Sequence, residues 1–156
     1  MNKHKALGLG SNVGDRAKNL QRATQMLEDS GVHVIKRSSI YETEPVDCRD
    51  EGWFLNQVVF IETGLTPREC FRGCKKIEAK MGRQYSYRNA PRIIDIDLLL
   101  WNEVILNDKD LVVPHKSIHG RKFVLIPLLE IAEDIKILEW LVYAIQGQKI
   151  KKYEKD

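Results

Sequence analysis

Hydrophobic and polar residues alternate along the chain with two different periods, one typical of strands and one typical of helices. Period-two segments predict strands over residues 5–10, 32–43, 54–64 and 92–101, with a short hairpin within 102–113. Apolar residues three or four positions apart predict helices over residues 15–31 and 66–82, and a shorter helical region after Pro127. This order predicts an α+β fold of the ferredoxin-like βαββαβ type, in which helices cover one face of an antiparallel sheet and leave the other side for an active site.

Both longer helices carry boundary signals in the sequence. The first begins with an acid, Asp15, and is stopped by Gly31. The second has Pro67 in its first turn and Gly82 just past its end. These residues set the expected helix ends independently of the hydrophobic pattern.

The length of 156 residues suits one domain with one sizeable core. We therefore expect a single domain over residues 1–156, with residues 147–156 as a frayed C-terminal tail. No uninterrupted apolar run approaches the ~20 residues that a membrane span needs. The net charge of +3 is low for a sequence-independent nucleic-acid binder, because Lys and Arg are dispersed along the chain. Neither a membrane nor a nucleic acid is an expected partner.

The cysteines indicate a reducing compartment. Cys48, Cys70 and Cys74 are an odd number without a CxxC motif, and no second Cys/His pair has the spacing of a zinc site. The N-terminus also lacks the long apolar stretch and small-residue cleavage site of a secretory signal. Free thiols in the cytoplasm are therefore expected.

The segment "LGLGSNVGDR" is similar to the glycine-rich turn of dinucleotide-binding proteins. Its glycines, Gly8, Gly10 and Gly14, leave the last gap one residue longer than in GxGxxG. The following apolar run has no acid before Glu42 and carries basic residues where the acid that binds ribose should lie. The pattern therefore argues against a dinucleotide site.

Two aspartates lie inside the most apolar predicted strand. Asp95 and Asp97 are two apart, so both side chains point to the same face with Cα atoms ~6.5 Å apart, while Ile94, Ile96 and Leu98 point to the other. Two neighbouring carboxylates repel, and a hard divalent cation such as Mg²⁺ removes that repulsion. The alternative is a solvent-exposed strand face that is simply acidic.

Three arginines favour the metal interpretation. Arg92 precedes the acid pair, and Arg83 and Arg88 lie in the polar loop before it. Guanidinium groups next to metal-binding acids suit a magnesium-bound polyphosphate, because each can bind two phosphate oxygens. Plain salt bridges between arginines and acids remain the alternative for each of them.

At the level of whole motifs, the chain resembles the 6-hydroxymethyl-7,8-dihydropterin pyrophosphokinase family from about residue 5 to about residue 132. The segments that carry the resemblance, in order, are "GSNVGDR", "SSIYETEPV", "FLNQVV", "IEAKMGR", "PRIIDIDLLLW" and "VPHKSIHGRKFVLIPLLEI". The resemblance implies a monomeric, ATP-dependent diphosphotransferase of folate biosynthesis with a ferredoxin-like fold. Such an enzyme moves the β,γ-pyrophosphoryl group of MgATP to the hydroxymethyl oxygen of the pterin and releases AMP.

The resemblance also implies the residues of the nucleotide site. Asp95 and Asp97 match acids that bridge two Mg²⁺ ions, which arrive with ATP. Together with Arg83 and Arg92 they match the family's catalytic residues. The positions that match the ATP site are Glu78, Arg88, Arg92, Leu98, His115 and Arg121.

The pterin site follows in the same way. Phe54 and Phe123 match two aromatic residues that sandwich the flat ring, and Asn56 matches a residue that hydrogen-bonds its edge. The remaining positions that match this pocket are Thr43, Pro45, Val46 and Asp95. Residues 44–53 and 83–91 are the segments expected to close over the substrates and exclude water.

Other interpretations of these residues stay open at this point. On sequence alone, Phe54 and Phe123 are more typical of core aromatics than of a ring clamp. An RNA-recognition module has the same βαββαβ order, but the chain lacks its paired glycine and aromatic spacing, and Asp95 and Asp97 would repel phosphates without a metal. A zinc pair at His115 and His119 lacks the acid of the HExxH motif.

Overall fold

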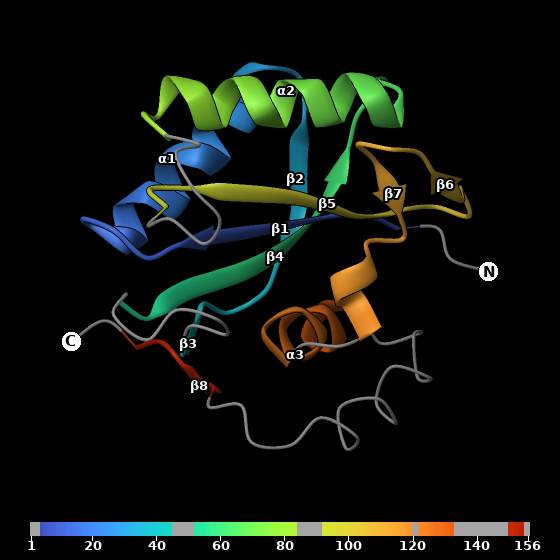
Figure 1. Cartoon of the computed structure of the whole chain (residues 1–156). Coiled ribbons are helices and arrows are strands. Elements are labelled where there is room, and N and C mark those ends of the chain that lie inside the picture. Colours follow the sequence, from blue (N-terminus) through green and yellow to red (C-terminus); the bar gives the residue numbers. More distant parts are fainter. Residues whose placement is uncertain (1–3, 45–51, 84–91, 120–121, 133–149, 155–156) are drawn as a thin grey trace.

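The computed structural model describes residues 4–44, 52–83, 92–119, 122–132 and 150–154 (Figure 1). In chain order the elements are β1 (Lys5–Ser11), α1 (Arg16–Asp29), β2 (His33–Arg37), β3 (Tyr41–Thr43), β4 (Phe54–Glu62), α2 (Pro67–Lys80), β5 (Asp95–Trp101), β6 (Leu106–Asn107), β7 (Val112–Val113), the 3-10 helix η1 (Lys116–His119), α3 (Lys122–Ile131) and β8 (Ile150–Lys152). The predicted ends of the first two helices are confirmed. Asp15 caps α1 by accepting from the Lys18 N–H, and Thr66 and Glu69 form a capping box at α2.

The main sheet is antiparallel, with strand order β5-β1-β4-β3-β8, and β2 also pairs with β4. Helices α1 and α2 cover one face, and α3 lies against the other (Figure 1). This arrangement confirms the predicted ferredoxin-like α+β class. One feature was not predicted from the sequence. The third helix, α3, lies on the face that was expected to carry the active site.

The long strand predicted over residues 32–43 is two short strands along the same neighbour, β4. Between the two strands, Ser38 makes two hydrogen bonds to Val58 of β4. Its N–H donates to the Val58 carbonyl at 2.9 Å, and its Oγ accepts from the Val58 N–H at 3.0 Å. Gln57 also donates to the Ser38 carbonyl at 2.9 Å. A hydroxyl that competes for backbone partners therefore interrupts the strand.

Two predictions near the C-terminus are wrong. Helix α3 does not start after Pro127 but at Lys122, with the proline inside it. Residues 150–152 are not part of a frayed tail, since they pair with β3 as strand β8. The Tyr153 N–H continues this pairing by donating to the Ile40 carbonyl at 2.6 Å, and the Tyr153 ring packs on the core. A further helix, predicted from the apolar pattern of "ILEWLVYAIQG" at residues 137–147, lies outside the described residues.

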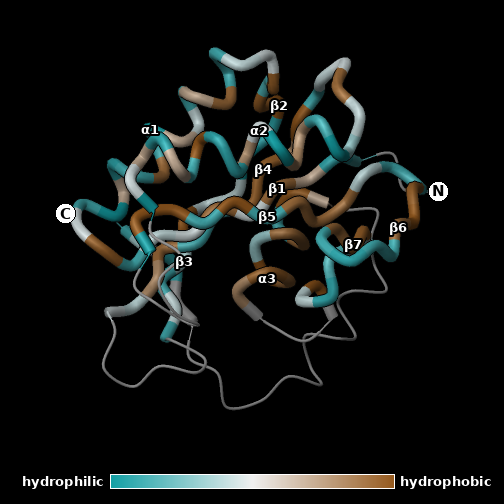
Figure 2. The backbone as a smooth tube through the Cα atoms, turned by 45° about the horizontal axis from the view of Figure 1, so that its top comes forward, coloured by the Kyte–Doolittle hydropathy of each residue, from teal (hydrophilic) through white to brown (hydrophobic). Residues whose placement is uncertain are grey.

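Each face of the sheet has its own hydrophobic core. Figure 2 shows hydrophobic residues in the central strands and in α3. The larger core joins α1 and α2 to the sheet and includes Ile94, Ile96 and Leu98, as the alternation predicts. The smaller core joins α3 to the opposite face and includes Leu99 and Leu100. The alternation is interrupted at Leu99 and Leu100, which both face the α3 core, because the register between β5 and β1 shifts there.

No helix among the described residues is long and apolar enough to cross a membrane.

Candidate active site

The sheet face under α3 changes from apolar to polar along the strands. Val58 and Phe60 on β4 and Leu99 on β5 pack into the α3 core. Further along the same face the side chains become those of Asn56 and Asp97. Strands β4 and β5 therefore supply both the apolar and the polar residues of this face. The side chains between them point to the α1 and α2 core.

Gly10 connects the two halves of this polar surface. It pairs with Asp95 of β5 on one side and with Asn56 of β4 on the other. The acid and the amide are therefore two strand spacings apart, roughly 10 Å. A Cβ at Gly10 would lie 3.0 Å from the Asn56 Oδ1, closer than such contacts normally are. The glycine leaves a floor without side chains between the acid and the amide.

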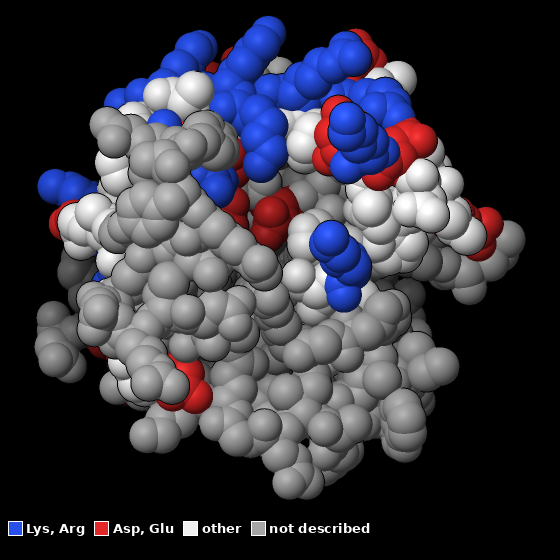
Figure 3. All heavy atoms as spheres, viewed as in Figure 1, with Lys and Arg blue, Asp and Glu red and all other residues white. Residues whose placement is uncertain are grey.

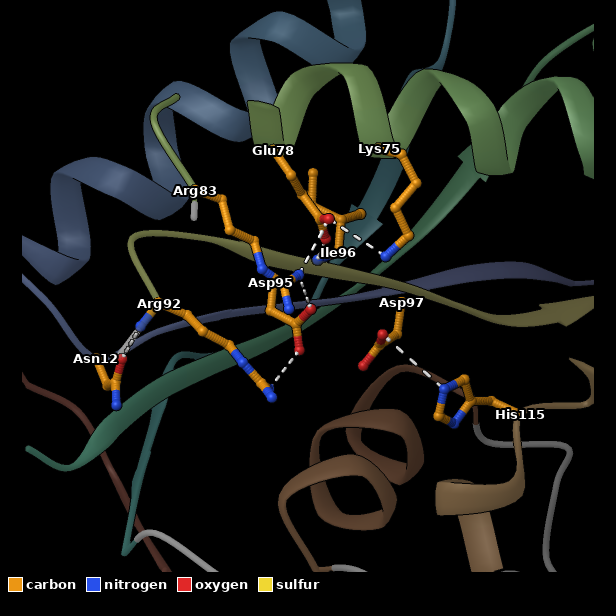
Figure 4. Close-up of polar contacts among 9 residues, drawn as sticks. All are labelled: Asn12, Lys75, Glu78, Arg83, Arg92, Asp95, Ile96, Asp97 and His115. Atoms are coloured by element: carbon orange, nitrogen blue, oxygen red, sulfur yellow. Dashed lines mark hydrogen bonds and ion pairs between the residues drawn. The ribbon is translucent and has the colours of Figure 1, made fainter. Parts of the chain in front are cut away.

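The predicted placement of the acid pair is confirmed, because Asp95 and Asp97 lie on one face and Ile96 is buried on the other (Figure 4). Asp95 is held by both predicted arginines. Its Oδ1 accepts from Arg83 Nη1 at 2.7 Å, and its Oδ2 accepts from Arg92 Nη1 at 3.2 Å. The salt bridges therefore exist, and they gather the acids and arginines at one point of the sheet.

Asp97 lies in an environment that disfavours its charged form. Partial burial and the neighbouring Asp95 raise the pKa of Asp97 from its ordinary value of 3.8 to about 7, against the opposing effect of Lys75. Its side chain is still 34% exposed, so the carboxyl is accessible. A divalent cation at this point would relieve the repulsion between the two acids.

The donor set fits Mg²⁺ that arrives with a nucleotide. Carboxylate oxygens are hard ligands, and Mg²⁺ is commonly held by one or two of them together with substrate phosphates. Among the described residues no group of three or more His, Cys, Asp or Glu could hold a metal ion. Phosphate and water oxygens are the usual ligands that complete the coordination of Mg²⁺ at such a pair.

Glu78, which the family resemblance assigns to the ATP site, is a buried residue of α2. Its side chain is 0% exposed, so in this structure it offers no surface to a ligand. Its Oε1 lies 3.2 Å from Lys75 Nζ and 3.0 Å from Arg83 Nη1, and its Oε2 accepts from the Ile96 N–H at 2.7 Å. Glu78 thus connects α2 to the outer edge of β5 and orients Arg83 toward Asp95.

Lys75 is a site residue that the sequence analysis missed. It lies one helical turn before Glu78 on α2, and its ammonium group points toward the acid pair (Figure 4). The spacing of three positions to Glu78 was the available signal, because such residues share a helix face. Basic side chains of α2 line the rim of a recess in which acidic atoms are visible (Figure 3). The basic residues of this helix are Arg68, Arg72, Lys75, Lys76 and Lys80.

His115, which the family resemblance assigns to the ATP site, lies beside the acid pair. Its Nδ1 accepts from the Ser117 N–H at 3.1 Å, so the proton of the neutral ring is on Nε2. This Nε2 lies 3.9 Å from the Asp97 Oδ1. The ring therefore presents an N–H donor to whatever binds next to Asp97.

The Leu98 side chain is buried in the α1 and α2 core and cannot contact a ligand. Strand β5 is at the sheet edge, and the Ile96 N–H already points outward to Glu78. Since main-chain groups two residues apart point the same way, Leu98 also presents its main chain to that edge. The predicted ATP contact of Leu98 thus requires its main chain.

Two of the predicted pterin residues form a buried pair at the other end of the polar surface. Asn56 Nδ2 donates to Thr43 Oγ1 at 2.7 Å, which fixes the orientation of the amide. Phe54 begins β4 on the same face as Asn56, and Phe123 lies in the first turn of α3, partly packed on its core. Arg88, Arg121, Pro45 and Val46 lie outside the described residues, as do most of the two segments expected to close over the substrates.

Acids and basic side chains gathered on one face of a ferredoxin-like sheet suit a transferase that binds a nucleotide. The family model for 7,8-dihydro-6-hydroxymethylpterin-pyrophosphokinase matches residues 6–133. The 2-amino-4-hydroxy-6-hydroxymethyldihydropteridine pyrophosphokinase of Methylorubrum extorquens is 46% identical over 132 residues, which are 84% of each chain. The enzyme of the same name from Bacillus subtilis is 42% identical over 137 residues, which are 87% of this chain and 82% of that one. The chain belongs to the 7,8-dihydro-6-hydroxymethylpterin-pyrophosphokinase family.

The solved structures agree at the level of the fold. The Plasmodium falciparum HPPK-DHPS triple mutant with STZ-DHP superposes with a TM-score of 0.64 and 18% identity, over 84% of this chain. The match spans 40% of that longer chain.

Family membership establishes the activity. The protein is a pyrophosphokinase of folate biosynthesis, which transfers the β,γ-pyrophosphoryl group of ATP to the hydroxymethyl oxygen of 6-hydroxymethyl-7,8-dihydropterin. The RNA-recognition interpretation is not favoured.

Proposed function

We propose that the pyrophosphoryl group is transferred on the sheet face between Asp95 and Asn56, with the nucleotide phosphates at the acid and the pterin at the amide. The pairing of Gly10 with both residues carries this proposal. It sets the two ends of the site roughly 10 Å apart across a floor without side chains. Bound substrates can therefore approach one another without displacing the sheet.

In this proposal Asp95 and Asp97 hold two Mg²⁺ ions. When bound, the ions supply positive charge that offsets the charge developing on the triphosphate. Asp97 carries an unfavourable negative charge before the ions arrive, and Asp95 keeps two arginines nearby. These properties support the pair as a site that is completed by the substrate.

Arg83 and Arg92 are proposed to bind phosphate oxygens. Each now donates to a carboxylate oxygen of Asp95, and a guanidinium group can exchange such a partner for a phosphate oxygen of similar geometry. The pterin hydroxymethyl oxygen then attacks the β-phosphorus as the bond to the α-phosphate oxygen breaks, and AMP leaves. His115 is proposed to donate from Nε2 to the phosphates beside Asp97.

Asn56 is proposed to bind the pterin edge, since an amide offers both donors and an acceptor. Thr43 takes one donor of the amide and leaves its Oδ1 toward the floor at Gly10. Phe54 and Phe123 are proposed to stack on the ring, which contributes roughly 0.5–1.5 kcal/mol beyond area burial. Pro45, Val46, Arg88 and Arg121 keep their proposed roles from the family resemblance.

The first test combines product analysis with metal removal. With MgATP and the hydroxymethyl-dihydropterin, AMP should form only when both substrates are present. Chelation of divalent cations should stop turnover and weaken ATP binding, measured by calorimetry, by roughly tenfold or more. Release of ADP would contradict pyrophosphoryl transfer, and equally tight ATP binding in EDTA would contradict the proposed metal site.

A second test addresses the floor at Gly10. Gly10→Ala should raise the KM for the pterin by about tenfold, because the new methyl group displaces the Asn56 amide it would otherwise approach to 3.0 Å. Gly64→Ala is the matched control, since a Cβ there meets nothing within 4 Å. An unchanged pterin KM in Gly10→Ala, measured in the steady state, would argue against pterin binding at Asn56.

We further propose that the chain acts as a monomer of one domain in the cytoplasm. Cys70 and Cys74 are free and buried in the α2 core, in agreement with a reducing compartment. Light scattering on a size-exclusion column tests the monomer directly.

A further inference from the structure

We propose that Asn12 is a positioning residue for Arg92, and that the loop between β1 and α1 acts on the reaction through this contact. The inference rests on the proposed role of Arg92 at the phosphates. It gives the segment "GSNVGDR" a function that neither a dinucleotide turn nor simple loop closure provides.

Two hydrogen bonds join the residues in opposite directions (Figure 4). The Arg92 N–H donates to Asn12 Oδ1 at 2.6 Å, and the Asn12 N–H donates to the Arg92 carbonyl at 3.0 Å. Asn12 is buried, with 7% of its surface exposed. The pair therefore forms in a region of low dielectric, where such bonds are strong and their loss is costly.

Arg92 lies just before β5 and outside the strand ladder. The two hydrogen bonds from Asn12 to the Arg92 main chain thus fix the position of the Arg92 backbone, from which its long side chain extends. From there its Nη1 reaches the Asp95 Oδ2 at 3.2 Å. A shift of this starting point moves the guanidinium group relative to the phosphates, and small misplacements of this kind strongly reduce rates.

The loop that carries Asn12 is itself held in place. Asn19 on α1 donates from Nδ2 to the Ser11 Oγ at 3.1 Å and to the Val13 carbonyl at 2.8 Å. On the other side a Cβ at Gly52 would lie 3.2 Å from the Asn12 carbonyl oxygen. Asn12 therefore lies between Arg92 and the segment that leads into β4, where the pterin is proposed to bind.

A double-mutant cycle separates positioning from a general structural role. Asn12→Ala should lower kcat by about tenfold or more in the native background. In the Arg92→Ala background the same change should alter kcat by less than about twofold, because the group through which Asn12 acts is gone. Asp15→Ala is the control, since it weakens the same loop by removing the α1 cap without contacting Arg92.

A second measurement does not depend on activity. In Asn12→Ala the Arg92 amide hydrogen should exchange with solvent at least about tenfold faster than in the native protein, as followed by NMR. In Asp15→Ala that amide should keep its protection, while the first-turn amide of Lys18 loses it. Equal loss of Arg92 protection in both variants would overturn the inference.

The kinetic outcomes are also decisive. Effects of Asn12→Ala and Arg92→Ala that multiply would mean that the residues act independently, and the inference would be wrong. Full turnover in Asn12→Ala together with impaired turnover in Arg92→Ala would overturn the inference alone. Full turnover in Arg92→Ala would remove the proposed phosphate role of Arg92 and the inference with it.

Discussion

Replacement of Asp97 by alanine is expected to reduce turnover at least ~100-fold while the protein stays folded, because it removes a proposed ligand of the ions that stabilise the transition state. The measurement is the steady-state rate of AMP formation at saturating substrates. Fold retention is checked by circular dichroism. Near-normal turnover in this variant would show that the metal assignment is wrong.

The charged carboxylate of Asp97, which the reaction is proposed to need, should also lower the stability of the metal-free protein. In the metal-free folded protein the pKa of Asp97 is raised to about 7 by partial burial and by Asp95, whereas in the unfolded chain it returns to 3.8. The folded state therefore binds the proton more tightly, and stability falls as pH rises from about 4 to about 7. Above this range the loss is complete and stays constant.

Asp97→Asn should therefore raise the melting temperature in EDTA at pH 8 and have much less effect near pH 4. Thermal unfolding at both pH values measures this. Glu103→Gln, in the exposed turn after β5, is the control and should show no such pH-dependent gain. A melting-temperature difference that is the same at both pH values would mean that the environment of Asp97 is not the cause.

Local patterns in the sequence predicted the parts of the fold that depend on local geometry. The alternation of Asp95 and Asp97 with Ile94 and Ile96 placed acids and core residues on the correct faces, because side chains of a strand alternate whatever the strand pairs with. Asp15 also predicted the start of α1 correctly, since capping is a contact within one turn.

The features that could not be predicted depend on contacts between distant segments. Nothing in the sequence indicated that Glu78 is buried, because its burial depends on the Ile96 N–H of β5, 18 positions away. The tail was expected to fray because "KIKKYEKD" is polar, although β3 offers it a free edge. Pro127 read as a helix start because proline removes a hydrogen bond in a helix interior, a penalty that α3 packing offsets.

The pair of hydrogen bonds between Asn12 and Arg92 could not be predicted from the sequence for the same reason. The two residues are 80 positions apart, and nothing in "GSNVGDR" indicates which segment its amide contacts. Sequence patterns thus identified the groups that do chemistry, whereas the groups that hold them in place required the structure.

Glu78→Ala is expected to be the most destabilising of the proposed substitutions, by about 1–3 kcal/mol in the free energy of unfolding. The change removes the carboxylate that three groups share and leaves the Ile96 N–H without its acceptor. Arg83, only 11% exposed, would retain Asp95 as its carboxylate partner among these residues. Urea denaturation measures the loss.

Lys75→Met provides the matched control. Lys75 is the partly exposed partner of Glu78, and its ion pair should contribute at most about 1 kcal/mol to the free energy of unfolding. The more informative variant is Glu78→Gln, which keeps an acceptor for Ile96 and the shape of the side chain but removes the charge that orients Arg83. If Glu78 positions Arg83, Glu78→Gln should retain most of the stability and still lower kcat by about tenfold, as misplacement of a phosphate-binding group does. Normal kcat in a stable Glu78→Gln protein would mean that Asp95 alone suffices to orient Arg83, and that Glu78 serves only to attach α2 to β5.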